Sequence, residues 1–198
     1  MRRGALSCGL ILVLFFGLGR AASGLTSAPV DFGTLVREAE QIIQGEITAV
    51  RSEWMTNASG RFILTLVTVK VRDSLKGEVP ESLVLEFFGG KIGEREMGVV
   101  GMPEFRVGDI EFLFVAGNGH DICPLVGLHH GRFRVITVAT SAPARVFLHD
   151  GAPLRDVASV GRAADRGGAP RLADASQAMT AEEFTRLIRQ RLSELPAR

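Results

Sequence analysis

The sequence predicts a mainly β protein with antiparallel strands, and three observations support this fold class. Short apolar or alternating runs recur along the chain, turns rich in glycine, proline or polar residues follow them, and no helical pattern separates one run from the next. Parallel strands need a long crossover connection, so an antiparallel meander is expected. About five to seven such strands remove their exposed edges by closing, which favours a small OB-like barrel over a sandwich.

The elements are expected in a simple order. A short N-terminal helix is predicted over residues 31–39, where apolar residues repeat at helical spacing. Gly45 lies inside the first apolar run that follows and indicates a bulge or a close backbone approach. Strands are predicted over residues 41–50, 61–75, 82–88, 110–114, 125–128, 132–138 and 146–148.

The N-terminus has the pattern of a secretory signal peptide over residues 1–24. Two arginines precede the apolar run Leu10–Leu18, and small residues follow it at 21–24. The run is shorter than the ~20 residues of a membrane-spanning helix. A secreted or periplasmic protein without a stable membrane anchor is therefore expected.

Three further segments are predicted after the signal peptide. Residues 25–148 form the β-barrel domain, and residues 149–178, which are poor in large apolar side chains, form a flexible linker. Residues 179–198 form a C-terminal amphipathic helix that begins with a capping box, in which Thr180 is the N-cap and Glu183 the third helical residue. Its single apolar stripe is expected to dock on the barrel.

Charge and cysteine content exclude some classes of protein. Without residues 1–24 the chain keeps 20 Lys and Arg, which is 23 minus Arg2, Arg3 and Arg20, against 22 Asp and Glu. A net charge of −2 by this count gives no electrostatic reason to expect nucleic acid as a partner. Cys123 is then the sole cysteine, so no internal disulfide can form and an apolar core has to hold the fold.

A resemblance to a group of uncharacterised exported bacterial proteins covers residues 35–138. It is carried by the segments LVREAEQIIQGEITAV, TLVTVKVRDSLKG, VLEFFGGKIG, GMPEFRVGDIEFLF and LVGLHHGRFRV. The strand layout is also similar to the netrin-like OB barrel of the tissue inhibitors of metalloproteinases. Those inhibitors use an N-terminal cysteine held by disulfides, which the mature chain lacks, so the resemblance implies a fold and no inhibitory residue.

The stretch HDICPLVGLHH contains the most chemistry-bearing residues: His120, Cys123, His129 and His130. Adjacent side chains of a strand point to opposite faces, so His129 and His130 are not expected to join one zinc site. A Cys–His catalytic pair would need an orienting group that the sequence does not show. No metal, no cofactor and no catalytic residue are therefore predicted; the histidines are expected at strand ends and Cys123 as a small buried hydrophobe.

The glycine-rich segment Gly89–Gly108 is the predicted binding surface, because it is longer than a hairpin needs and more apolar than a disordered loop. An alternative is that Phe105 folds back and closes the end of the barrel. The residues proposed to bind are Lys91, Arg95, Glu96, Met97, Val99, Val100 and Met102.

The predicted function is an exported, non-catalytic binding or accessory module with a protein or peptide ligand, of which a protease-associated module is a special case. The alternative is a hydrolase with a dispersed active site. No GxSxG, HExxH or GxxxxGK[ST] motif occurs in the sequence, which favours the binding module.

Overall fold

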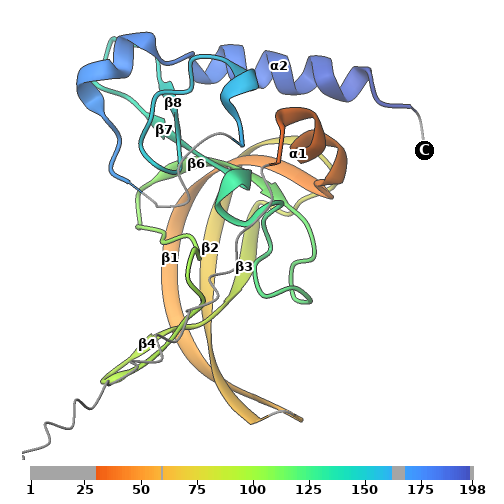
Figure 1. The fold of residues 1–198 in the computed structure, drawn as a ribbon, viewed down its shortest axis with the longest axis vertical. Coiled ribbons are helices and arrows are strands. Elements are labelled where there is room, and N and C mark those ends of the chain that lie inside the picture. The colour runs from red at the N-terminus through yellow and green to blue at the C-terminus, as the bar shows by residue number, and fades with distance from the viewer. Residues whose placement is uncertain (1–29, 59, 162–167, 197–198) are drawn as a thin grey trace, which may run out of the picture.

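The computed structural model describes residues 30–58, 60–161 and 168–196, and the protein is mainly β (Figure 1). Eight strands lie in two sheets, and every pairing between them is antiparallel. The predicted fold class is confirmed at this level. The predicted signal peptide lies outside the described residues, so it remains a prediction.

The main sheet has six strands in the order β3-β2-β1-β6-β7-β8, and in this order β3 and β8 are the two ends. A closed barrel would need β3 to pair with β8, and the strand order of the described residues does not include that pairing. The six strands are β1 (Gln41–Asn57), β2 (Gly60–Lys76), β3 (Ser82–Phe88), β6 (Ile110–Val115), β7 (Arg132–Ile136) and β8 (Arg145–Leu148). The second sheet is a small hairpin of β4 (Gly90–Ile92) and β5 (Arg95–Met97) within the segment predicted as a loop.

Strands β1 and β2 are the longest, and their hairpin projects away from the helices (Figure 1). The register of the pair shifts at three places, one of them between Gln44 and Gly45. A Cβ at Gly45 would collide with the Val69 side chain and lie 2.9 Å from the Lys70 carbonyl oxygen. The bulge and the close backbone approach predicted for Gly45 are both confirmed.

Two α-helices cover one face of the sheet. Helix α1 (Phe32–Glu38) begins at Asp31, whose carboxylate accepts a hydrogen bond from the Thr34 amide at 2.7 Å. Helix α2 (Ala181–Ser193) begins at Thr180, whose hydroxyl accepts from the Glu183 amide at 3.1 Å, so the predicted N-cap is confirmed. Figure 1 shows α2 across the end of the molecule that carries α1 and β6–β8. No helix among the described residues is long and apolar enough to cross a membrane.

The helices and the sheet enclose an apolar core around Phe184 of α2. Its ring lies 4.9 Å from that of Phe133 and 5.1 Å from that of Phe112. A second apolar cluster lies on the opposite face of β6, where Leu113 and Val115 are buried. Strand β6 is therefore covered on both sides.

Two predicted segments differ from the structure. Residues 125–128 are not a strand: only Leu125 makes an isolated bridge, to Val115, and the chain then enters the 3₁₀ helix η1 (Leu128–Gly131). The described part of the predicted linker is packed, because Leu154 and Val160 lie in the core with α2 and Leu154 donates its amide to the Val146 carbonyl. Two short 3₁₀ helices follow, η2 (Val157–Ser159) and η3 (Leu172–Gln177). The domain boundaries at 148 and 178 remain predictions.

Candidate functional site

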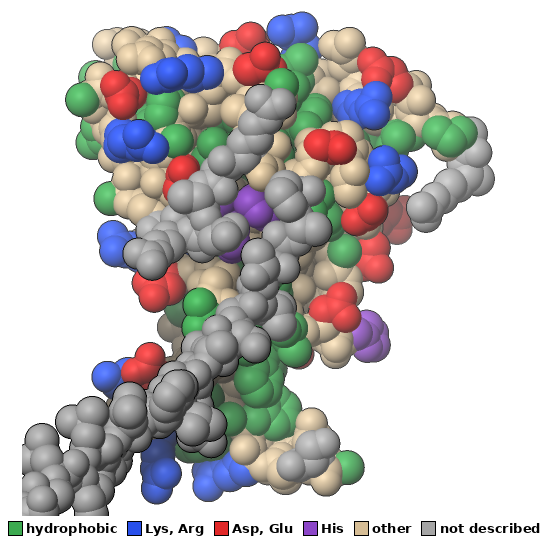
Figure 2. Space-filling model, in the orientation of Figure 1, with side chains coloured by type: hydrophobic (Ala, Val, Ile, Leu, Met, Phe, Trp, Pro, Cys, Tyr) green, Lys and Arg blue, Asp and Glu red, His purple; other side chains and the backbone are tan. Residues whose placement is uncertain are grey.

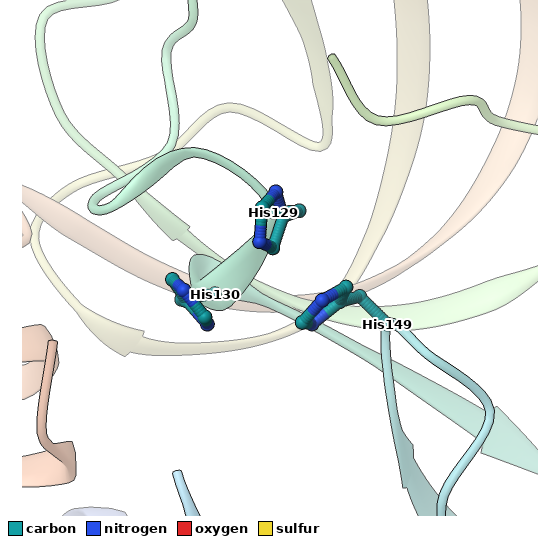
Figure 3. A group of neighbouring side chains, drawn as sticks. All are labelled: His129, His130 and His149. Atoms are coloured by element: carbon teal, nitrogen blue, oxygen red, sulfur yellow. The ribbon is translucent and has the colours of Figure 1, made fainter. Parts of the chain in front are cut away.

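Three buried histidines, His129, His130 and His149, gather at one point of the fold (Figure 3). Their exposed fractions are 6%, 4% and 3%. His129 and His130 belong to η1, directly before β7, and His149 directly follows β8. The antiparallel pairing of β7 with β8 places the start of the first strand beside the end of the second, which brings the three side chains together.

A tight turn sets the direction of the two adjacent histidines. Gly127, the N-cap of η1, and Leu128, its first residue, have φ angles of 64° and 58°, so two successive residues are left-handed where η1 begins. Leu128 is the sole non-glycine residue with a positive φ among the described residues, and such strain is often found at functional sites. The two histidines do lie beside a strand end, since η1 directly precedes β7. The expectation that they point to opposite faces is wrong, because a 3₁₀ turn does not alternate its side chains and the two ring centroids are 4.4 Å apart.

The three imidazoles are close enough for one metal ion. One ring nitrogen from each histidine lies within 4.8 Å of the other two, and the ring centroids of His129 and His149 are 4.0 Å apart. Tetrahedral zinc with Zn–N bonds of 2.0–2.1 Å needs nitrogens separated by about 3.4 Å. To hold zinc, the three ring nitrogens would therefore have to move closer together by rotation of the side chains.

His129 has a free ring nitrogen in the interior. Its Nδ1 lies 3.3 Å from the Gly101 carbonyl oxygen, whereas its buried Nε2 has no hydrogen-bond partner. A proton on Nδ1 would donate to that carbonyl and leave a lone pair on Nε2. A backbone carbonyl on one nitrogen commonly orients a histidine whose other nitrogen binds a metal.

The other two residues of the HDICPLVGLHH stretch lie elsewhere. His120 is exposed. Cys123 is buried in the second apolar cluster, where burial raises the pKa of its thiol to about 11. Its predicted role as a small buried hydrophobe is confirmed.

A cavity of about 410 Å³ opens beside His129 and His149. Its wall consists of three parts. The first is formed by β7 and two residues of the histidine cluster, the second by the strand-free stretch 100–106 of the predicted binding segment, and the third by Gly168 and Ala169. Histidine side chains are visible near the middle of the face in Figure 2. The lining residues that matter here are His129, His149, Arg132, Arg134, Val100, Met102, Glu104 and Arg106.

The predicted binding residues divide between this cavity and the β4–β5 hairpin. Val100, which is 80% exposed, and Met102 line the cavity. The others lie on the hairpin or just after it, where Lys91 pairs with Glu96 across the two strands and Arg95 with Ile92. Met97 and Val99 are half-buried. Their role in binding remains a prediction.

Phe105 follows the alternative considered for this segment. Its ring lies 5.0 Å from that of Phe87, at the edge of the second apolar cluster. The guanidinium carbon of Arg132 lies 4.3 Å from the centroid of the same ring. Phe105 thus anchors the cavity wall to the sheet.

Two arginines of β7 lie on the cavity side, and they differ in their partners. Arg132 donates to both carboxylate oxygens of Glu111, at 2.5 and 2.6 Å, and to the Glu104 carbonyl. This fork is a buried ion pair. Arg134 donates one bond, to the Gly168 carbonyl at 2.8 Å, and its buried Nε has no partner.

Sequence reasoning missed His149 because the residue was assigned to a linker. A signal was present: LHHG directly precedes one predicted strand and His149 directly follows the next, VFL at 146–148. If those two strands form a hairpin, the histidines at its open end must be neighbours.

Comparison of the chain with protein-family models, with curated proteins and with solved structures gives no match. The function therefore has to be inferred from the chemistry of the three histidines and the adjacent cavity.

Proposed function

We propose that this protein is an exported binding module that holds a divalent transition-metal ion, of the zinc class, through His129, His130 and His149. The observation that carries the proposal is the convergence of three buried ring nitrogens within 4.8 Å. Neutral imidazole is a good ligand for zinc, copper and nickel, and three histidines form one of the known protein ligand sets of zinc.

Burial argues against simple packing as the reason for the cluster. Histidine is seldom chosen for a core position without a partner, and an unmet buried polar atom costs about 1–3 kcal/mol. His129 Nε2 is such an atom. A metal ion would supply the missing interaction and link two elements, η1 and the end of β8.

A zinc-dependent hydrolase is a second candidate. Three protein ligands leave a fourth coordination position, and catalytic zinc sites keep that position open for water or substrate. The 410 Å³ cavity beside His129 and His149 favours this candidate. Turnover of an activated ester by the zinc-loaded protein, lost in the His149→Phe variant, would support a hydrolase; equal rates in both would leave the binding module.

We propose the remaining features of the module from the sequence. Residues 1–24 direct export, which gives a secreted or periplasmic location, and a protein or peptide remains the proposed macromolecular partner, a protease-associated role included. The exposed Val100 at the cavity rim supports a contact surface there. The strongly bent β1–β2 pair supports an OB-like arrangement of the sheet, although the open strand order leaves closure as a proposal.

Replacement of single ligands tests the metal site. His129→Phe and His149→Phe keep a ring of similar size and remove the nitrogen donors, so each should weaken zinc binding about 100-fold or more, which is about 3 kcal/mol. Isothermal titration of the mature chain with zinc measures the affinity. At a free zinc concentration of about 100 times Kd, the wild type should gain about 2.7 kcal/mol of unfolding free energy.

His120→Ala is the matched control, because His120 is exposed and outside the cluster. It should bind zinc as the wild type does. Equal zinc affinity in all four proteins would show that the metal binds elsewhere and would refute the proposal. Thermal unfolding of each variant without metal separates loss of the site from loss of the fold.

A further inference from the structure

We propose, on the basis of the metal site above, that the open position of the metal takes a compact oxyanion, a carboxylate or a phosphate group, whose remaining oxygens bind the guanidinium of Arg134. The juxtaposition that carries this inference is one cavity lined by His129, His149 and Arg134, an arginine that forms no ion pair with a described residue.

The strand register and the direction of the Glu111 side chain together explain why Arg134 forms no ion pair with Glu111. Its Cα lies opposite that of Glu111 on β6, the position from which a carboxylate would neutralise it. The Glu111 side chain instead turns to Arg132 and gives it both oxygens. Asp109 lies close to the same pair, with its Oδ2 4.0 Å from Arg132 Nη2, so two carboxylates face the two arginines. Both carboxylates pair with Arg132, which leaves Arg134 without an ion pair to a described residue.

Arg134 is also partly withdrawn from water. Its Nε is buried and unpartnered, and one bond to the Gly168 carbonyl holds the guanidinium in place. None of the ion pairs between described residues includes it. Burial, and next to it the charge of Arg132, lowers the pKa of Arg134, and the charges of Glu111 and Asp109 offset part of this effect. An anion beside Arg134 would favour its positive charge further.

The metal increases the need for an anion. Three neutral imidazoles leave the full double charge of the ion, and Arg134 adds another positive charge at the same cavity. Charges of one sign repel strongly where water is partly excluded. An oxyanion that coordinates the metal and accepts hydrogen bonds from the arginine fork compensates both, and the planar fork matches carboxylate and phosphate oxygens.

Two further charged residues that line the cavity, Glu104 and Arg106, do not provide this compensation. Glu104 and Arg106 are exposed at its rim, where opposite charges offset each other and solvent screens them. The volume of 410 Å³ lies within the range of small-molecule sites, so the anion is a small metabolite or ion rather than a polymer.

Anion binding to the cobalt-loaded protein tests the inference, since cobalt(II) reports changes in its own coordination by its visible spectrum. Inorganic phosphate and oxalate are titrated separately into wild type, Arg134→Gln and Arg134→Lys. In Arg134→Gln the dissociation constant for the preferred anion should rise about 10- to 100-fold, as expected for one or two charged hydrogen bonds. Arg134→Lys should recover part of the affinity. Tighter binding of phosphate would indicate a phosphate site, and tighter binding of oxalate would indicate a carboxylate site.

Arg155→Gln is the matched control, because it removes an exposed arginine that does not line the cavity, and its anion affinity should stay within about threefold of the wild type. Equal affinity in wild type and Arg134→Gln would overturn the inference while the metal site stands. A spectrum unaffected by either anion in the wild type would do the same. Failure of cobalt to bind the wild type would instead refute the metal site on which the inference rests.

Discussion

At the scale of single residues, Cys123 shows what burial does to a titratable group. The thiol is surrounded by the apolar cluster of Leu125 and Phe87, and burial raises its pKa to about 11. In the unfolded chain the thiol loses its proton near pH 8.5. Between these two values the folded protein holds a proton that the unfolded chain has released.

Stability should therefore depend on Cys123 at alkaline pH. A raised folded-state pKa gives a contribution that is fully present below about pH 8.5 and is lost as the pH rises toward 11. Two to three pKa units correspond to about 3 kcal/mol. Denaturant unfolding of the mature wild type and of Cys123→Ala from pH 8 to 11 should show a steeper loss in the wild type. Parallel curves for the two proteins would mean that the thiol is not protected by the core.

Residue-scale prediction from the sequence succeeded where a local pattern determines the outcome. Gly45 was assigned a bulge and Thr180 an N-cap, and each depends on neighbours a few residues away. His149 was missed because its environment is created by strand pairing, with Leu148 of β8 opposite Phe133 of β7. The lack of an ion pair between Arg134 and a described carboxylate was equally inaccessible, since it depends on the direction in which the Glu111 side chain turns.

At the scale of elements, helix α2 belongs to the core rather than to the surface. Phe184 and Ile188 are fully buried, and the Phe184 ring contacts those of Phe112, Phe133 and Phe32. The sequence predicted that the stripe would dock on the sheet, and periodicity could show no more than that. How deep the stripe lies depends on the faces of β6 and β7 that it meets.

Truncation of Phe184 should thus cost as much as truncation within a strand. Phe184→Ala removes a fully buried ring and is expected to lower the free energy of unfolding by about 3–5 kcal/mol. Arg186→Ala, on the exposed side of the same helix, should change it by less than about 0.5 kcal/mol. Urea unfolding of both variants measures the difference; a loss below 1 kcal/mol for Phe184→Ala would contradict the packing described here.

The element that carries His129 and His130 is the least predictable from the sequence. LVGL at 125–128 is an apolar run that reads as a strand, yet the backbone turns left-handed at Gly127 and Leu128 and forms η1. An apolar run of four residues does not distinguish a strand from a buried turn. Without that turn, the argument that His129 and His130 diverge would have been correct.

At the scale of the whole molecule, the chain after β8 completes the structure on which the site depends. Leu154, Val160, Met179, Phe184 and Ile188 belong to one apolar cluster with Phe112, Phe114 and Phe133 of the sheet. Gly168 also belongs to this later part, and its carbonyl orients Arg134. Composition alone predicts a flexible linker over residues 149–178, because large apolar residues are few there. The described part of this segment is nevertheless packed, since a few well-placed apolar residues such as Leu154 and Val160 are enough to anchor it.

Deletion of residues 151–198 should therefore unfold the protein rather than release a helix from a stable barrel. The deletion exposes the apolar face of β6 and β7 that α2 and Leu154 cover, and burial of that area contributes about 25 cal/mol per Å². The truncated chain is expected to lose its sharp thermal transition and its zinc binding together, as followed by calorimetry and zinc titration. Full-length Arg186→Ala serves as the control that the C-terminal region tolerates surface change. A truncated chain that unfolds cooperatively at the wild-type temperature would show that residues 25–148 are an independent domain and that the later residues are the linker and appended helix that the sequence predicts.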